Sequence, residues 1–267
     1  MTTEQTVLVE KRDHVYLVTL NRPERLNAFD QATMVNMYTT FESIADDPQC
    51  RALVLTGAGG NFSAGGDVRG LGLGESMAKQ PTITLMENMR RFQHRLQMSI
   101  ANLPMPTIAA IEGVAISGGL DLALCCDMRI SAAGARICEN YSRLGLVPGN
   151  GGCFLLSAII GPAKAAELVF TGKTINGKDA LALGLVTHLA DDGGALAAAL
   201  TLAEAIAANA PIAVRFAKEL LMSEHRAKLQ THLQQVGPLV SMLQQTADHA
   251  EGALAIREKR KPRFTGV

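Results

Sequence analysis

The chain has 267 residues, 48% hydrophobic and 19% charged, which is enough length and apolar content to bury a large core and excludes general disorder. Its 25 basic and 25 acidic residues cancel, so the overall charge does not indicate a nucleic-acid partner. The five cysteines lack metal-ligand spacing, and we expect reduced core thiols in a cytoplasmic protein without a metal site. No export signal or membrane-spanning run is evident, so no membrane partner is expected.

The first part of the chain predicts a hairpin, a helix and a buried strand. Residues 6–11 and 15–21 alternate or run apolar on either side of a polar turn, which is typical of a hairpin. Asp30 is a good N-cap for a helix that a proline at residue 48 stops. The apolar run 52–56 fits a strand buried on both faces.

A glycine-rich stretch follows at residues 57–68. One interpretation is a flexible connection that ends in an N-capping Asp67. The other is functional: glycines let a ligand approach the backbone closely, and the N–H groups around Ala64 and Gly65 would be exposed for binding. Two donors from separate loops make a better oxyanion hole than one donor.

A long helix is predicted over residues 82–103. Its apolar stripe consists of Leu85, Met89, Phe92, Leu96 and Ile100, which we interpret as core. His94 lies off that stripe, so we expect it to face solvent. Prolines end the helix, and residues 107–111 form the next strand.

The next turn, at residues 111–124, joins a buried strand to an apolar helix. Ser117 is suited to N-cap this helix, and Gly118 and Gly119 begin it. The free N–H groups of a helix start can bind an anion or a developing oxyanion, and Asp121 would place a carboxylate one turn away. This pattern predicts an oxyanion hole beside an acid or base, although a tight structural turn has the same residues.

The remaining chain alternates short strands and helices until about residue 190 and is then almost wholly helical. Strands are expected at 126–131, 135–138 and 185–189, and helices at 153–160, 161–170, 177–183 and from 195 onward. We therefore predict an α/β core over residues 1–190 and a helical C-terminal region over 191–267, with the boundary at 191–194.

Seven short motifs in order resemble the crotonase superfamily, the enoyl-CoA hydratase/isomerase family, over nearly the whole chain. They are 20–28 (LNRPERLNA), 62–67 (FSAGGD), 113–119 (GVAISGG), 126–130 (CDMRI), 144–149 (LGLVPG), 180–186 (ALALGLV) and 259–264 (KRKPRF). The resemblance implies a crotonase-like α/β fold, a spiral of ββα units. It also implies a helical C-terminal trimerisation region, with a homotrimer or a dimer of trimers as the assembly.

The same resemblance implies an acyl-CoA site. The family's two oxyanion-hole amides fall on Ala64 and Gly118, where they would hold the thioester carbonyl of an acyl-CoA substrate as it becomes an enolate. Coenzyme A is then part of the substrate, and no separate cofactor is implied. The implied CoA contacts, as cofactor-binding residues, are Arg25, Ala28, Ala64, Asp67, Lys259 and Phe264.

The chain departs from the family at the two catalytic glutamates. Those positions fall on Asp121 and Tyr141, and a phenol titrates near about 10, so Tyr141 is a poor replacement for a carboxylate base. It could instead orient a carboxylate or a water. Glu139 shares the strand parity of Tyr141 and could assist, but its position two residues early favours a surface or structural role.

Several functions remain open at this point. The first is an enoyl-CoA hydratase that converts a 2-enoyl-CoA to a 3-hydroxyacyl-CoA. The second is isomerisation, decarboxylation or hydrolysis of a carbon–carbon bond through the same enolate. The third is a non-catalytic acyl-CoA-binding protein or an RNA-binding relative, which the neutral charge disfavours. A hydrolase with Ser117 as nucleophile is also conceivable, although no histidine is positioned by sequence to activate it.

Overall fold

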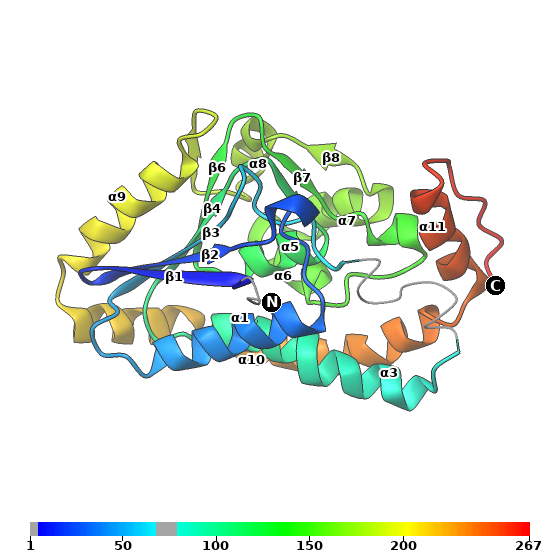
Figure 1. The fold of residues 1–267 in the computed structure, drawn as a ribbon, viewed down its shortest axis with the longest axis horizontal. Helices are drawn as coiled ribbons and strands as arrows, with labels where there is room; N and C mark the ends of the chain where they lie inside the picture. Colours follow the sequence, from blue (N-terminus) through cyan, green and yellow to red (C-terminus); the bar gives the residue numbers. More distant parts are fainter. Residues whose placement is uncertain (1–4, 68–78) are drawn as a thin grey trace.

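A six-stranded sheet organises the computed structural model, which describes residues 5–67 and 79–267 (Figure 1). Its order is β1-β2-β3-β4-β6-β9, with β1 antiparallel to β2 and every other pair parallel. The strands are β1 Val7–Arg12, β2 Val15–Leu20, β3 Ala52–Gly57, β4 Thr107–Ile111, β6 Met128–Ala132 and β9 His188–Ala190. Parallel neighbours need a crossover between them, and the helical segments of the chain supply it.

A second sheet of three strands stands beside the first and carries the central turn. Its strands are β5 Val114–Ile116, β7 Arg136–Cys138 and β8 Thr174–Ile175. A bridge between Ser63 and Ala115 joins the glycine-rich loop to β5, and a second bridge joins Phe29 to Gly66. The segment before α1, the glycine-rich loop and the central turn therefore lie side by side. Residue 68, the last of the predicted glycine-rich stretch, lies outside the described residues.

Helices cover both faces of the six-stranded sheet. Helix α9, Ala195–Ala207, packs four alanines at a spacing of four residues against Val54, Ile108 and their neighbours. Helices α1 Gln31–Ala45, α4 Arg95–Ala101 and α5 Gly118–Leu124 contribute to the larger core on the other side. Although α9 lies beyond residue 190, it packs on the sheet, and the division of the chain at that point stays a prediction.

The predicted long helix contains an irregular segment in its middle. Helix α3, Thr82–Asn88, continues through a π-helix at Met89–His94 into α4. The wider π turn changes the rotation of the residues that follow it. The prediction that His94 faces solvent is therefore wrong: the side chain is buried, and its Nε2 lies 3.1 Å from the Gly149 carbonyl oxygen.

The rest of the chain adds short helices and a long C-terminal arm. These elements are η1 Pro23–Arg25, η3 Tyr141–Leu144, α6 Gly152–Ile160, α7 Pro162–Thr171, α8 Gly177–Leu183, α10 Pro211–Leu243 and α11 Ala247–Arg257. Helix α11 lies at the right-hand end of Figure 1 and packs against η3. There His249 Nδ1 donates to the Leu144 carbonyl over 2.8 Å, and Gly252 packs against Leu144.

Among the described helices, none is by itself long and apolar enough to cross a membrane. Helices α9 and α10 satisfy that length and composition criterion only when they are taken together, and the chain bends by 111° between them. Helix α9 buries its alanine face on the sheet, as described above.

Candidate active site

Side chains of the segment before α1 hold the glycine-rich loop in place. Asn27 donates from Nδ2 to the carbonyls of Ala58 and Asn61, over 2.8 and 2.7 Å. In return, the Ser63 hydroxyl donates to the Asn27 carbonyl over 2.9 Å. Each of these buried polar groups has its hydrogen-bond partner in the other segment, so these hydrogen bonds fix the conformation of the loop.

Two backbone amides at the start of α5 face this loop. Gly65 has a φ of +84°, and a Cβ there would lie 2.9 Å from the Gly118 nitrogen and 3.2 Å from the Gly119 nitrogen. Glycine therefore keeps the approach to both nitrogens open. Within residues 5–67 and 79–267, neither N–H donates a hydrogen bond, as expected for the first turn of a helix. The Gly118 amide accordingly has the features predicted for an oxyanion donor.

The other predicted oxyanion donor has a partner in this structure. The Ala64 N–H donates to the Leu26 carbonyl over 2.9 Å. Leu26 and Asn27 both have positive φ angles, 51° and 55°, which non-glycine residues seldom adopt. A carbonyl oxygen therefore already occupies the Ala64 amide, and a thioester oxygen would have to replace it.

Ser117 precedes α5 but does not cap it. Its φ of 47° and ψ of −119° are strained for a serine, and its hydroxyl makes no capping hydrogen bond to the helix. The hydroxyl donates instead to Oδ1 of Asn140. The prediction of a side-chain cap is therefore wrong, and the described partner of the hydroxyl is an amide oxygen, not a base that would activate a nucleophile.

Asp121 lies at the end of a buried chain of hydrogen bonds. It projects from α5 and is 0% exposed. The Tyr141 hydroxyl, from η3, donates to Asp121 Oδ2 over 2.8 Å, and Asn150 Nδ2 donates to the Tyr141 oxygen over 3.1 Å. Tyr141 therefore donates a hydrogen bond to the carboxylate, and its role in orienting that carboxylate for catalysis stays a prediction.

Glu139 lies in the same buried space as Asp121. It is 1% exposed, and a Cβ at Gly152 would lie 2.3 Å from Glu139 Oε1 and 2.4 Å from Asp121 Oδ1. Within the described part of the chain, neither of these two oxygens accepts a hydrogen bond. Of the surface or structural role expected for Glu139, the surface position is therefore wrong, because the residue that follows β7 turns its side chain inward; whether it is structural or assists catalysis stays a prediction.

Burial sets the protonation of the two acids. Removal from water raises the pKa of Asp121 to about 7, and the hydrogen bond from Tyr141 opposes part of that rise. Burial and the neighbouring Asp121 raise the pKa of Glu139 well above its usual range. Two carboxylates this close cannot both ionise cheaply, so burial and proximity favour a pair that shares one proton near neutral pH.

The predicted CoA-contacting residues come from two parts of the chain, one that runs from η1 to the glycine-rich loop and one that follows α11. Arg25 is exposed in η1, whereas Ala28 is buried close by. Asp67 is buried and forms an ion pair of 3.2 Å with Arg22. Lys259 and Phe264 lie exposed after α11. In the part of the chain described, no hydrogen bond or ion pair joins either of them to η1 or to the glycine-rich loop.

Two amide residues of the site were missed in the sequence. Asn140 binds the Ser117 hydroxyl, and Asn150 binds the Tyr141 hydroxyl. The signal for Asn150 was its position in the polar glycine turn that opens α6, where a buried amide must find a partner. Among residues 5–67 and 79–267, no group of three or more His, Cys, Asp or Glu side chains is arranged to hold a metal ion.

Comparison with known proteins gives a consistent family. The family model described as enoyl-CoA hydratase/isomerase matches residues 10–267. The human enoyl-CoA hydratase domain-containing protein 2, a mitochondrial protein, is 35% identical and aligns over 93% of this chain and 85% of its own. Mouse mitochondrial methylglutaconyl-CoA hydratase is 31% identical over 97% of this chain and 82% of its own. The crystal structure of an enoyl-CoA hydratase/isomerase from Pseudoalteromonas atlantica is 30% identical with a TM-score of 0.85, and the match covers 97% of this chain and 100% of that one.

Proposed function

The chain belongs to the enoyl-CoA hydratase/isomerase family and is an acyl-CoA enzyme of that family, and from this premise we propose that it hydrates a 2-enoyl-CoA to a 3-hydroxyacyl-CoA with the Asp121–Glu139 pair. The single observation that carries the proposal is that pair of buried carboxyl groups: Asp121, which accepts from Tyr141 and lies one helical turn from the Gly118 amide, and Glu139 beside it. Hydration needs one group to accept a proton and another to donate one.

The amide groups at the start of α5 would bind the thioester carbonyl. During attack at C3, electrons move onto the thioester oxygen, so N–H donors that are already in place stabilise the transition state more than the substrate. Gly118 supplies one donor. Ala64 supplies the second once the thioester oxygen replaces the Leu26 carbonyl, which now accepts that hydrogen bond.

The carboxyl pair would accept one proton and donate another during the reaction. Ionised Asp121 takes a proton from water as the water oxygen bonds to C3 and the enolate forms. Protonated Glu139 then gives its proton to C2 as the enolate collapses, and transfer of the new proton from Asp121 to Glu139 restores the pair. The reaction adds one water molecule across the double bond and needs no oxidant or reductant, so it requires no cofactor besides the CoA of the substrate.

Double-bond isomerisation is the second candidate, and the Tyr141 hydrogen bond favours it. Tyr141 is not a carboxylate, so Asp121 could act alone as the base that moves one proton along the acyl chain. Both reactions use the same enolate and the same oxyanion donors. They differ in whether Glu139 is required and in whether water enters the product.

The test compares substrates and two variants. Crotonyl-CoA should lose its enoyl absorbance and give 3-hydroxybutyryl-CoA, and Asp121→Asn should reduce kcat by about 10²- to 10⁴-fold with little change in CoA-ester affinity. Glu139→Gln should reduce hydration similarly. Isomerisation of a 3-enoyl-CoA that survives Glu139→Gln, with no hydration by the wild type, would replace the hydratase proposal with the isomerase.

A further proposal concerns assembly and location. Helix α10 exposes a row of large apolar side chains, including Ile212, Phe216 and Leu220, the last of which is 85% exposed. Isolated chains rarely leave such a row in water, so we propose that it packs between subunits of a homotrimer or of a dimer of trimers. Free, mostly buried cysteines support a cytoplasmic location.

A further inference from the structure

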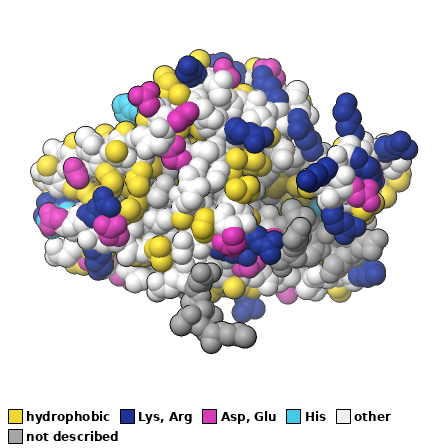
Figure 2. Space-filling view, turned by 45° about the horizontal axis from the view of Figure 1, so that its top comes forward, with side chains coloured by type: hydrophobic (Ala, Val, Ile, Leu, Met, Phe, Trp, Pro, Cys, Tyr) yellow, Lys and Arg dark blue, Asp and Glu magenta, His cyan; other side chains and the backbone are white. Residues whose placement is uncertain are grey.

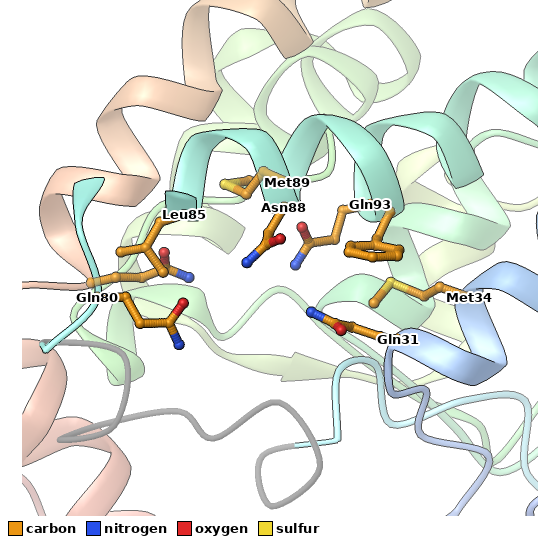
Figure 3. A pocket seen from close by; sticks show the side chains of 9 residues that line it. Gln31, Met34, Gln80, Leu85, Asn88, Met89 and Gln93 are labelled. Atoms are coloured by element: carbon orange, nitrogen blue, oxygen red, sulfur yellow. The ribbon is translucent and has the colours of Figure 1, made fainter. Parts of the chain in front are cut away.

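A pocket lined by amide side chains lies next to the proposed active site and has no role in the reaction written above (Figure 3). Its cavity measures about 40 Å³. The lining residues are Gln31, Met34, Gln80, Leu85, Asn88, Met89, Phe92, Gln93 and Gln244. Five of these nine side chains carry a carboxamide and none carries a charge.

Elements far apart in the sequence bring the amides together. In Figure 3 the amide groups of Asn88 and Gln93 point down from α3 and the π-helix, and Gln31 points up toward them from the start of α1. The wider turn of the π-helix brings Asn88 and Gln93 onto one side, and π segments often mark functional positions. The pocket therefore depends on the irregular segment of this helix.

One of the amides has an unmet hydrogen-bonding need. Gln244 follows α10 and is 4% exposed, and its Oε1 accepts no hydrogen bond from any residue in the described ranges. Burying an amide oxygen without a donor is costly, so native structures usually supply a partner. A molecule that fills this pocket should therefore offer an O–H or N–H group.

The pocket adjoins the active site on two sides. Met89 of the pocket wall lies against Gly149, since a Cβ there would be 3.0 Å from Met89 Cε, and Asn150 beside it binds the Tyr141 hydroxyl. On the other side, Gln31 is two residues after Phe29, whose ring would lie 3.2 Å from a Cβ at Gly118. Met89 is therefore shared by the pocket wall and the surroundings of the Gly149–Asn150 turn.

We propose that this amide pocket binds the far part of the acyl chain and selects chains that carry a neutral hydroxyl group there. Among the described residues that line the pocket there is no Lys or Arg to pair with a buried carboxylate. An alkyl end would remove the carboxamides from water without replacing their hydrogen bonds. A carbonyl could not donate to Gln244 Oε1, whereas a hydroxyl both donates to it and accepts from its neighbours. The inference rests on the proposed function, because the thioester must be anchored at Gly118.

Calorimetric binding of saturated acyl-CoAs tests the proposal without turnover. Each pair has the same chain length and ends in a methyl or a hydroxyl group, and a series of lengths covers the unknown reach. At the length that enters the pocket, the hydroxyl ester should bind about fivefold more tightly. Gln244→Met, which keeps the side-chain volume, should abolish that advantage, and so should Asn88→Leu. Gln234→Met, an exposed position on α10, should retain it.

The outcomes separate this inference from the function on which it rests. Equal affinities at every length, as expected if the pocket only holds water, would overturn the hydroxyl preference, as would a preference that survives Gln244→Met. If crotonyl-CoA is still hydrated in that case, the proposed function stands. If neither ester binds and acetoacetyl-CoA gives no enolate absorbance band, both the proposed function and the inference are wrong.

Discussion

The carboxyl groups of Asp121 and Glu139 lie close together at Gly152, although eighteen positions separate the two residues in the chain. Asp121 could be selected from the sequence, because it lies in the first turn of a helix that glycines open. The position of Glu139 could not, since it depends on contacts between distant segments and on the missing side chain at Gly152, where both acids meet. The alternation of side chains along a strand indicates to which side Glu139 points, but not how far it lies from Asp121.

Tyr141 provides a prediction for the pH dependence of the reaction. The hydrogen bond from its hydroxyl lowers the pKa of Asp121 against the effect of burial. Tyr141→Phe should therefore raise the pKa of that carboxyl and move the acidic limb of kcat/KM to higher pH. We expect about three- to tenfold lower activity at neutral pH. Tyr38→Phe, at a buried tyrosine away from the site, is the control, and an acidic limb that stays in place would remove Tyr141 from the proton pathway.

Asp121 also makes a prediction for stability. The pKa of its carboxyl is about 7 in the folded protein and near 3.8 in the unfolded chain. The stability that this carboxyl contributes is therefore fully present below about pH 4 and is lost as pH rises through 7. Asp121→Asn should therefore gain stability over the wild type across this range, by a few kcal/mol in order of magnitude above pH 7. Urea unfolding at several pH values measures this difference.

Asp47 is the matched control for that measurement. Tyr16 and Lys11 lower the pKa of its carboxyl to about 2, so its contribution is present above pH 4 and is lost as pH falls through 2. Asp47→Asn should thus show the opposite pH trend. A stability difference for Asp121→Asn that does not change between pH 4 and 8 would contradict the raised pKa.

At the scale of elements, the helix over residues 82–101 was predictable but its irregularity was not. An apolar stripe is compatible with both an α-helix and one that contains a single wide turn, because only the rotation after that turn differs. The outward position expected for His94 was wrong for this reason. The amide pocket depends on the same rotation, so it too could not be found from the sequence.

Glycine 152 links the start of α6 to both carboxyl groups. A Cβ there would meet Glu139 Oε1, Asp121 Oδ1 and, at 2.9 Å, the Pro148 Cβ. Gly152→Ala should force the acids apart and reduce kcat by about 10²-fold or more, with a modest loss of stability. Gly194→Ala, at the helical start of α9, is the control. Full activity in Gly152→Ala would contradict the close approach of the two carboxyl groups.

At the scale of the whole molecule, the α/β class and the order of the elements followed from alternating short strands and helices. Helix α8 lies at the predicted residues, whereas β9 begins three residues later than predicted. What the sequence could not give was the separation of the strands into two sheets, because pairing depends on contacts between distant segments.

The exposed row on α10 predicts association between subunits. Leu220→Glu introduces a charge where the proposed assembly buries a leucine, and it should weaken association by about tenfold or more per contact. Sedimentation velocity should then show smaller species, while circular dichroism stays unchanged. Leu181→Glu, at an exposed leucine of α8, should leave the assembly intact. A wild-type protein that sediments as a monomer would contradict the proposal.

The packing of α11 on η3 has a consequence for biosynthesis. The turn that presents Tyr141 is contacted by His249 and Gly252, which a ribosome adds long after it has added Tyr141. The core strands and α5 are already made at that time. A nascent chain therefore carries Asp121 and Glu139 before the turn beside them is held in place, and we expect activity only once α11 has left the exit tunnel and docked on η3.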